Sequence, residues 1–146
     1  MKKTTQSAAE TMDLAKLLYE EYPEHKIWLL YGDLGTGKTT LIKGLGEALG
    51  LGSDLIKSPT YTLVSEYAPL VHYDLYRIEE MDDLTRELLH EHMESGKHIV
   101  IEWPEKIESE VITSHLKIYL THGGGDVRKV QIMQFRSHRR TLSSLS

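Results

Sequence analysis

Short apolar runs and amphipathic segments alternate along the first hundred residues. The runs at 26–31 and 98–102 have the length and composition of buried strands. Gly32 stops the first run, and leucines at helical spacing, Leu41 and Leu45, follow it directly. This pattern predicts a strand, a glycine turn and a helix in immediate succession.

The rest of the pattern adds helices and antiparallel strands. Ser7 and Glu10 have the spacing of a capping box, which marks the start of a first helix. The further predicted elements are helices at 7–21 and 82–93, a hairpin at 61–68 and 70–76, and strands around 116–120 and 130–132. We therefore expect an α/β fold of three layers whose central sheet is mixed parallel and antiparallel.

Composition sets the scale of the molecule. The chain has 146 residues, of which 40% are hydrophobic and 27% charged, and it has no cysteine. These values predict one compact domain over residues 1–146 that needs no disulfide. The cationic residues near the end (Arg128, Lys129, Arg136, Arg139 and Arg140) are interpreted as a basic, solvated C-terminal stretch, with a tail at about 136–146.

Charge and hydropathy also limit the classes of partner. A formal net charge of -5 argues against DNA binding through the phosphate backbone. Acidic residues interrupt the first helix where a signal peptide would need an apolar stretch, and nowhere do 18 apolar residues run together. We expect a cytoplasmic protein without a membrane span.

The glycine turn carries the strongest chemical signal. Residues 32–39, GDLGTGKT, satisfy the Walker A pattern, and they lie between a strand and a helix, as that motif requires. Glycines let successive backbone N–H groups surround phosphate oxygens, and the dipole of the next helix adds to the attraction. The predicted nucleotide-binding residues here are Asp33, Leu34, Gly35, Thr36, Gly37, Lys38, Thr39 and Thr40.

Two side chains of the motif have individual roles. Lys38 is expected to contact the β and γ phosphates, and the Thr39 hydroxyl to ligate Mg²⁺. ATP is favoured over GTP, because the chain contains no asparagine and so cannot form the guanine-reading Asn-Lys-x-Asp motif. The predicted cofactors are ATP and Mg²⁺.

A phosphate-loop site also needs an acid at a strand end. Glu102 closes the run HIVIE, and Asp74 follows the apolar positions of the second hairpin strand. Each is a candidate for holding Mg²⁺ or positioning water, and each has the alternative of being a solvated strand-end acid.

Four motifs together resemble the bacterial TsaE (YjeE) family. They are GDLGTGKTT at 32–40, SPTYTLVSEY at 58–67, HYDLYR at 72–77 and IEWPEK at 101–106. The resemblance covers about residues 7 to 135. It implies a Mg-dependent ATPase that acts with the TsaB and TsaD proteins in making N6-threonylcarbamoyladenosine (t6A) in tRNA, with any tRNA contact made through that complex.

The resemblance also implies roles for single residues. Lys38 and Thr39 correspond to the ATP and magnesium positions, Glu102 to a magnesium ligand, and Asp74 to the acid needed for hydrolysis. Further correspondences are Thr60 in a switch-like loop, Trp103 beside the nucleotide and Thr11 facing the adenine. Pro104 stands where the family commonly has Ser or Ala.

Two other functions remain open at the level of sequence. A small-molecule P-loop kinase would need an acceptor pocket and an arginine-bearing lid, and residues 60–102 are mostly predicted hairpin and helix. A nucleotide-sensing adaptor would share the phosphate loop but would not hydrolyse ATP.

Overall fold

A computed structural model describes residues 1–52 and 63–137. Its helices and strands, in chain order, are β1 Lys2–Thr5, α1 Ala8–Glu21, β2 Ile27–Tyr31, α2 Lys38–Ala48, β3 Val64–Glu66, β4 Leu70–Asp74, α3 Asp83–Glu94, β5 His98–Glu102, β6 His115–His122 and β7 Arg128–Phe135. Two short 3₁₀ turns, η2 Pro104–Lys106 and η3 Glu108–Glu110, follow β5. Within these residues no helix is both long and apolar enough to cross a membrane.

The strands form one sheet in the order β1-β7-β6-β2-β5-β4-β3. Strands β6, β2, β5 and β4 run parallel to one another, whereas β1, β7 and β3 pair antiparallel at the two sides. The mixed sheet expected from the sequence is confirmed. Its parallel centre places the carboxyl ends of β2, β5 and β4 along one edge of the sheet.

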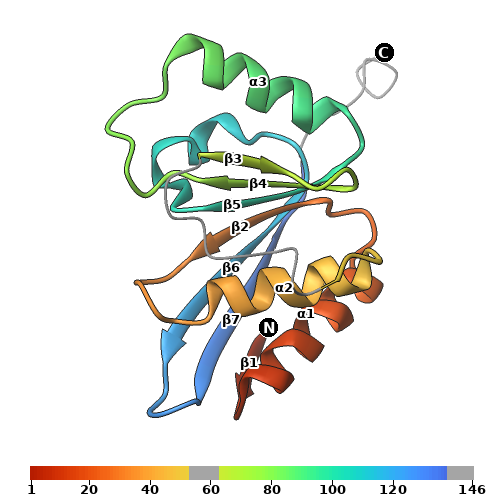
Figure 1. Cartoon of the computed structure of the whole chain (residues 1–146), viewed down its shortest axis with the longest axis vertical. Helices are drawn as coiled ribbons and strands as arrows, with labels where there is room; N and C mark the ends of the chain where they lie inside the picture. The colour runs from red at the N-terminus through yellow and green to blue at the C-terminus, as the bar shows by residue number, and fades with distance from the viewer. Residues whose placement is uncertain (53–62, 138–146) are drawn as a thin grey trace.

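Alternate residues of the central strands enter two separate cores. Trp28 and Leu30 of β2 pack with the buried faces of α1 and α2, while Leu29 packs with α3 through Leu89. Figure 1 shows α1 and α2 side by side, and α3 above β3 and β4. The predicted three-layer arrangement is therefore confirmed, because apolar side chains on both faces of each strand require cover.

Strand β1 was absent from the sequence prediction. Its residues, KKTT, lack the alternation of apolar and polar positions that predicts a half-buried strand, and only Thr5 is buried. The strand exists because its backbone pairs with β7, in the register Lys3 to Val130. Such pairing is a long-range property that local pattern does not encode.

Helices α1 and α2 approach closely at Gly44. A Cβ atom at this position would lie 2.4 Å from the Met12 carbonyl oxygen and 2.9 Å from Ala15 Cβ. Ordinarily, alanine stabilises a helix relative to glycine, but here the added methyl group would force the helices apart.

We expect Gly44→Ala to lower the free energy of unfolding by about 2 kcal/mol, as measured by urea denaturation. Lys43→Ala in the same helix is the matched control, and it should change stability by less than about 0.5 kcal/mol. A Gly44→Ala variant as stable as wild type would contradict this close helix packing.

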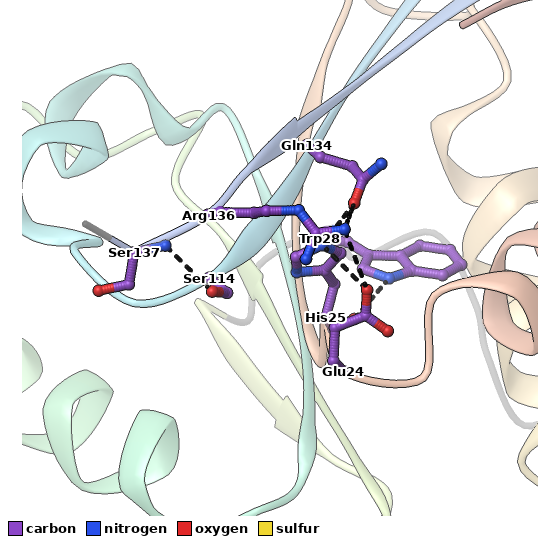
Figure 2. A network of polar contacts seen from close by, with 7 residues as sticks. All are labelled: Glu24, His25, Trp28, Ser114, Gln134, Arg136 and Ser137. Atoms are coloured by element: carbon purple, nitrogen blue, oxygen red, sulfur yellow. Dashed lines mark hydrogen bonds and ion pairs between the residues drawn. The ribbon is translucent and has the colours of Figure 1, made fainter. Parts of the chain in front are cut away.

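Polar contacts at the amino ends of the strands tie the end of β7 to the start of β2 (Figure 2). His25 Nε2 lies 3.0 Å from Gln134 Oε1, and Trp28 Nε1 donates to the His25 carbonyl oxygen. The Ser137 N–H donates to Ser114 Oγ. These contacts fix the sheet at the edge opposite the glycine turn.

His115 lies at this same edge of the sheet. We expect it to make the stability of the protein depend on pH. Burial lowers the pKa of His115, although its Nδ1 contacts the Thr113 carbonyl oxygen at 2.8 Å. Below about pH 6.5 the unfolded chain therefore binds a proton that the folded chain does not, so stability falls as pH decreases.

Replacing this residue, His115→Phe, should keep the stacking on Phe135 and reduce the loss of unfolding free energy between about pH 7.5 and pH 5. Each variant is compared with its own stability at the higher pH, using denaturant titrations. His122→Phe, at an exposed histidine, is the control. An unchanged slope in His115→Phe would show that this histidine is not responsible.

Candidate nucleotide-binding site

The glycine turn and both candidate acids meet at one edge of the sheet. Strand β2 ends at Tyr31, directly before Gly32, while β4 ends at Asp74 and β5 at Glu102. Residues Asp74 and Glu102 are register partners in adjacent parallel strands, so they lie about 5 Å apart in backbone position. The parallel sheet thus brings together positions far apart in sequence.

The turn from β2 to α2 has a conformation that requires glycine. Gly35 and Gly37 have φ angles of +77° and +98°, which other residues rarely adopt. A Cβ atom at Gly32 would lie 2.6 Å from Thr36 Oγ1 and 2.7 Å from the Leu120 carbonyl oxygen. The Thr36 hydroxyl donates to the Asp33 carbonyl oxygen at 2.8 Å and so closes the turn.

Lys38 begins α2 and lies inside the turn. Only 5% of its surface is exposed, and its Nζ donates to the Gly32 carbonyl oxygen at 2.6 Å. The Nζ atom also lies 3.9 Å from the centre of the Trp103 ring. Burial lowers the pKa of Lys38, while Glu102 and Asp74 oppose that shift. A cation is therefore held close to both acids.

The two acids point to the face of the sheet that α1 and α2 cover. His72 and Asp74 alternate with the buried Tyr73, which packs on the opposite face. Glu102 is 5% exposed, and its Oε2 lies 2.6 Å from His72 Nε2. This hydrogen bond supplies the buried carboxylate with a partner and fixes its orientation.

Asp74 is half-buried at the end of β4. Its Oδ1 accepts a hydrogen bond from the Tyr76 N–H at 3.1 Å. Burial raises the pKa of Asp74, and the negative charge of Glu102 adds to this, while the Tyr76 hydrogen bond opposes it. The two acids therefore differ in environment. A backbone N–H contacts Asp74, whereas a histidine side chain contacts Glu102.

Trp103 covers Lys38 from the end of β5. Its φ angle of +56° is left-handed, a strained conformation for a non-glycine residue. The ring also lies 4.7 Å from that of Tyr76. Pro104, the departure from the family pattern, starts η2 and suits that position because proline fixes the helical φ angle. The tryptophan ring therefore contacts both Lys38 and Tyr76.

The groups at this site have the chemistry that a magnesium ion bound to phosphates would need. Mg²⁺ prefers oxygen ligands and usually retains water and phosphate oxygens in its shell. The site offers the carboxylates of Glu102 and Asp74, with the Thr39 hydroxyl at the start of α2. Among the residues described, no group of three or more His, Cys, Asp or Glu side chains could hold a metal unaided. Such a site suits a metal that arrives with phosphates.

The structure does not bring every predicted residue to this site. Thr11 is buried in α1, where its hydroxyl contacts Thr5 Oγ1 at 2.7 Å, so its contact with adenine stays a prediction. Thr60 lies outside the described residues. Within the turn, Leu34 is 64% exposed and points into solvent, whereas Thr40 is half-buried in α2.

Sequence reasoning missed two residues of the site. His72 carries no sequence signal of its own beyond its place two residues before Asp74. Arg128, interpreted as part of a solvated basic stretch, instead begins β7 and contacts the glycine turn. That interpretation was wrong for Arg128, whereas Lys129, the next residue of β7, is exposed. The predicted tail lies outside the described residues from 138 onward.

Comparisons with known proteins agree with this arrangement. The family model described as threonylcarbamoyl adenosine biosynthesis protein TsaE matches residues 5–130. A TsaE protein of a Nostoc species is 40% identical over 132 residues, which cover 86% of this chain and 80% of that protein. The TsaE protein of Bacillus subtilis is 36% identical over 135 residues, covering 89% and 83%.

The fold is similar to a solved structure as well. The crystal structure of Bacillus subtilis YdiB superposes with a TM-score of 0.64 at 30% identity, covering 92% of this chain and 84% of that one. The four motifs, the mixed sheet and these matches agree over most of the length. The chain therefore belongs to the TsaE family, whose role is in the biosynthesis of threonylcarbamoyladenosine in tRNA.

Proposed function

We propose that this protein is a Mg-dependent ATPase of the cytoplasm that works with TsaB and TsaD in t6A synthesis. The proposal is supported chiefly by one observation, the meeting of Lys38, Asp74 and Glu102 at a Walker A turn. A lysine and two carboxylates around a phosphate-binding loop are the groups that ATP hydrolysis requires.

Lys38, Glu102 and Asp74 each have a distinct task in this proposal. Lys38 exchanges its hydrogen bond with the Gly32 carbonyl oxygen for phosphate oxygens, and so neutralises charge that develops during transfer. Glu102, oriented by His72, faces the metal position, and Mg²⁺ when bound neutralises phosphate charge there. Asp74 accepts a hydrogen bond from the attacking water and aligns it with the γ phosphate.

Exposed apolar residues beside the turn support a partner-dependent activity. Leu34 is 64% exposed and Tyr76 is 47% exposed, and Tyr76 contacts Trp103 over the lysine. Apolar side chains that surround a nucleotide site are suited to burial by a second protein. Docking of TsaB–TsaD would then depend on the nucleotide bound, as in other phosphate-loop switches.

The test is phosphate release from Mg-ATP by the purified protein, alone and with TsaB, TsaD and tRNA. We expect slow release alone and stimulation by the partners, together with formation of t6A. Leu34→Ser should reduce the stimulation by the partners relative to its own basal rate. Binding without single-turnover hydrolysis would indicate an adaptor, and transfer of phosphate to a small acceptor would indicate a kinase.

A further inference from the structure

An arginine from the far side of the chain lies against the glycine turn. Arg128 is the first residue of β7, and its Nη2 donates to the Gly35 carbonyl oxygen at 3.3 Å, across 93 positions of sequence. Its Nη1 donates to the carbonyl oxygens of Gly125 and Val127, at 2.6 and 3.0 Å. The guanidinium group therefore links the β6–β7 turn to the phosphate loop.

The rest of the side chain packs on the same loop. A Cβ atom built at Gly37 would lie 3.6 to 3.8 Å from Arg128 Nε, Cγ and Cδ, which is ordinary van der Waals contact. Two successive glycines of the Walker A motif are thus covered by one arginine. Since both glycines have left-handed φ angles, a contact that holds them favours the curled form of the loop.

Among the described residues, Arg128 contacts carbonyl oxygens and not a carboxylate. Its hydrogen-bond partners are carbonyl oxygens, and in residues 1–52 and 63–137 no acid lies within ion-pair distance of it. These contacts hold the cationic side chain of Arg128 beside the loop.

Several acids lie near the lysine of the loop. The groups that act on Lys38 are Glu102, Asp74, Glu105 and Asp33. Those carboxylates repel a triphosphate, and a positive charge beside the loop opposes that repulsion.

We propose that Arg128 is a positioning residue of the phosphate loop, which holds its curled form through Gly35 and supplies charge that raises affinity for nucleotide phosphates. The inference rests on the proposed function, since it assumes that the loop binds ATP. It assigns no catalytic step to Arg128.

The test is the affinity for ATP and for ADP, each with Mg²⁺ and with EDTA, measured by calorimetry over a range of sodium chloride concentrations. Arg128→Gln should weaken both affinities about tenfold, because it removes a charge-assisted contact. It should also reduce the dependence of affinity on salt. Arg128→Lys, which keeps the charge but not the fork of donors, should recover part of the affinity.

Lys129→Gln is the matched control, because it removes the same charge from the adjacent exposed position of β7. We expect wild-type affinity and thermal stability in that variant. Equal affinities of Arg128→Gln and wild type at every salt concentration would overturn the inference, as would equal losses in Arg128→Gln and Arg128→Lys. Failure of the wild-type protein to bind ATP would instead refute the proposed function.

Discussion

Replacing Lys38 with alanine is expected to abolish hydrolysis and to weaken Mg-ATP binding by about 100-fold or more. The side chain is the only lysine inside the described turn, and its Nζ lies within reach of the Gly32 carbonyl oxygen. Hydrogen bonds to charged groups contribute about 1.5–3 kcal/mol each, and a lysine inside a phosphate loop makes more than one. The acids that act on Lys38 would add repulsion once it is removed.

Two further variants separate charge from packing. Lys38→Met keeps an unbranched side chain against Trp103. It should weaken nucleotide binding as much as Lys38→Ala does. Lys43→Ala, on the same helix, should behave as wild type. Affinity is measured by calorimetry, and melting temperature confirms that each variant is folded. Near-normal Mg-ATP binding by folded Lys38→Met would mean that the loop does not use this lysine for phosphates.

The sequence predicts the centre of this site because its signals are local. The Walker A glycines, the strand before them and the helix after them are adjacent, so steric and hydrophobic rules act within one segment. The acids at 74 and 102 could also be proposed, since each ends an apolar run. That the two acids lie side by side could not be predicted, because it depends on the strand order β2-β5-β4 and not on either run alone.

Other features depend on contacts between distant segments. Strand β1 is polar and forms by backbone pairing with β7, and Arg128 reaches Gly35 only because β7 lies beside β6. The number of basic residues near the C-terminus indicated a solvated stretch, and this interpretation was wrong for Arg128. Likewise, the partner of Glu102 is a histidine whose importance is visible only once β4 and β5 are aligned.

The division of work between the two acids is the second large effect that we expect. Glu102→Gln preserves the shape of the side chain and keeps an oxygen that can accept from His72, but it removes the charge that we propose faces Mg²⁺. We expect hydrolysis to fall by about 100-fold and the concentration of Mg²⁺ needed for half-maximal rate to rise.

Asp74→Asn should have a different signature. If Asp74 aligns the attacking water, its loss lowers the rate of phosphate release by about 100-fold while the affinity for Mg-ATP stays as in wild type. Glu105→Gln is the matched control, because this exposed acid also acts on Lys38 but lies beyond the strand end.

Rates and affinities are measured for all three variants across a series of Mg²⁺ concentrations. A rise in magnesium requirement confined to Glu102→Gln assigns the metal to Glu102, because a lost ligand is partly offset by more free metal. The reverse pattern would assign the metal to Asp74 and leave Glu102, held by His72, to act on water. Full hydrolysis in both variants would contradict the proposed ATPase mechanism, since no carboxylate would then be required at the end of either strand.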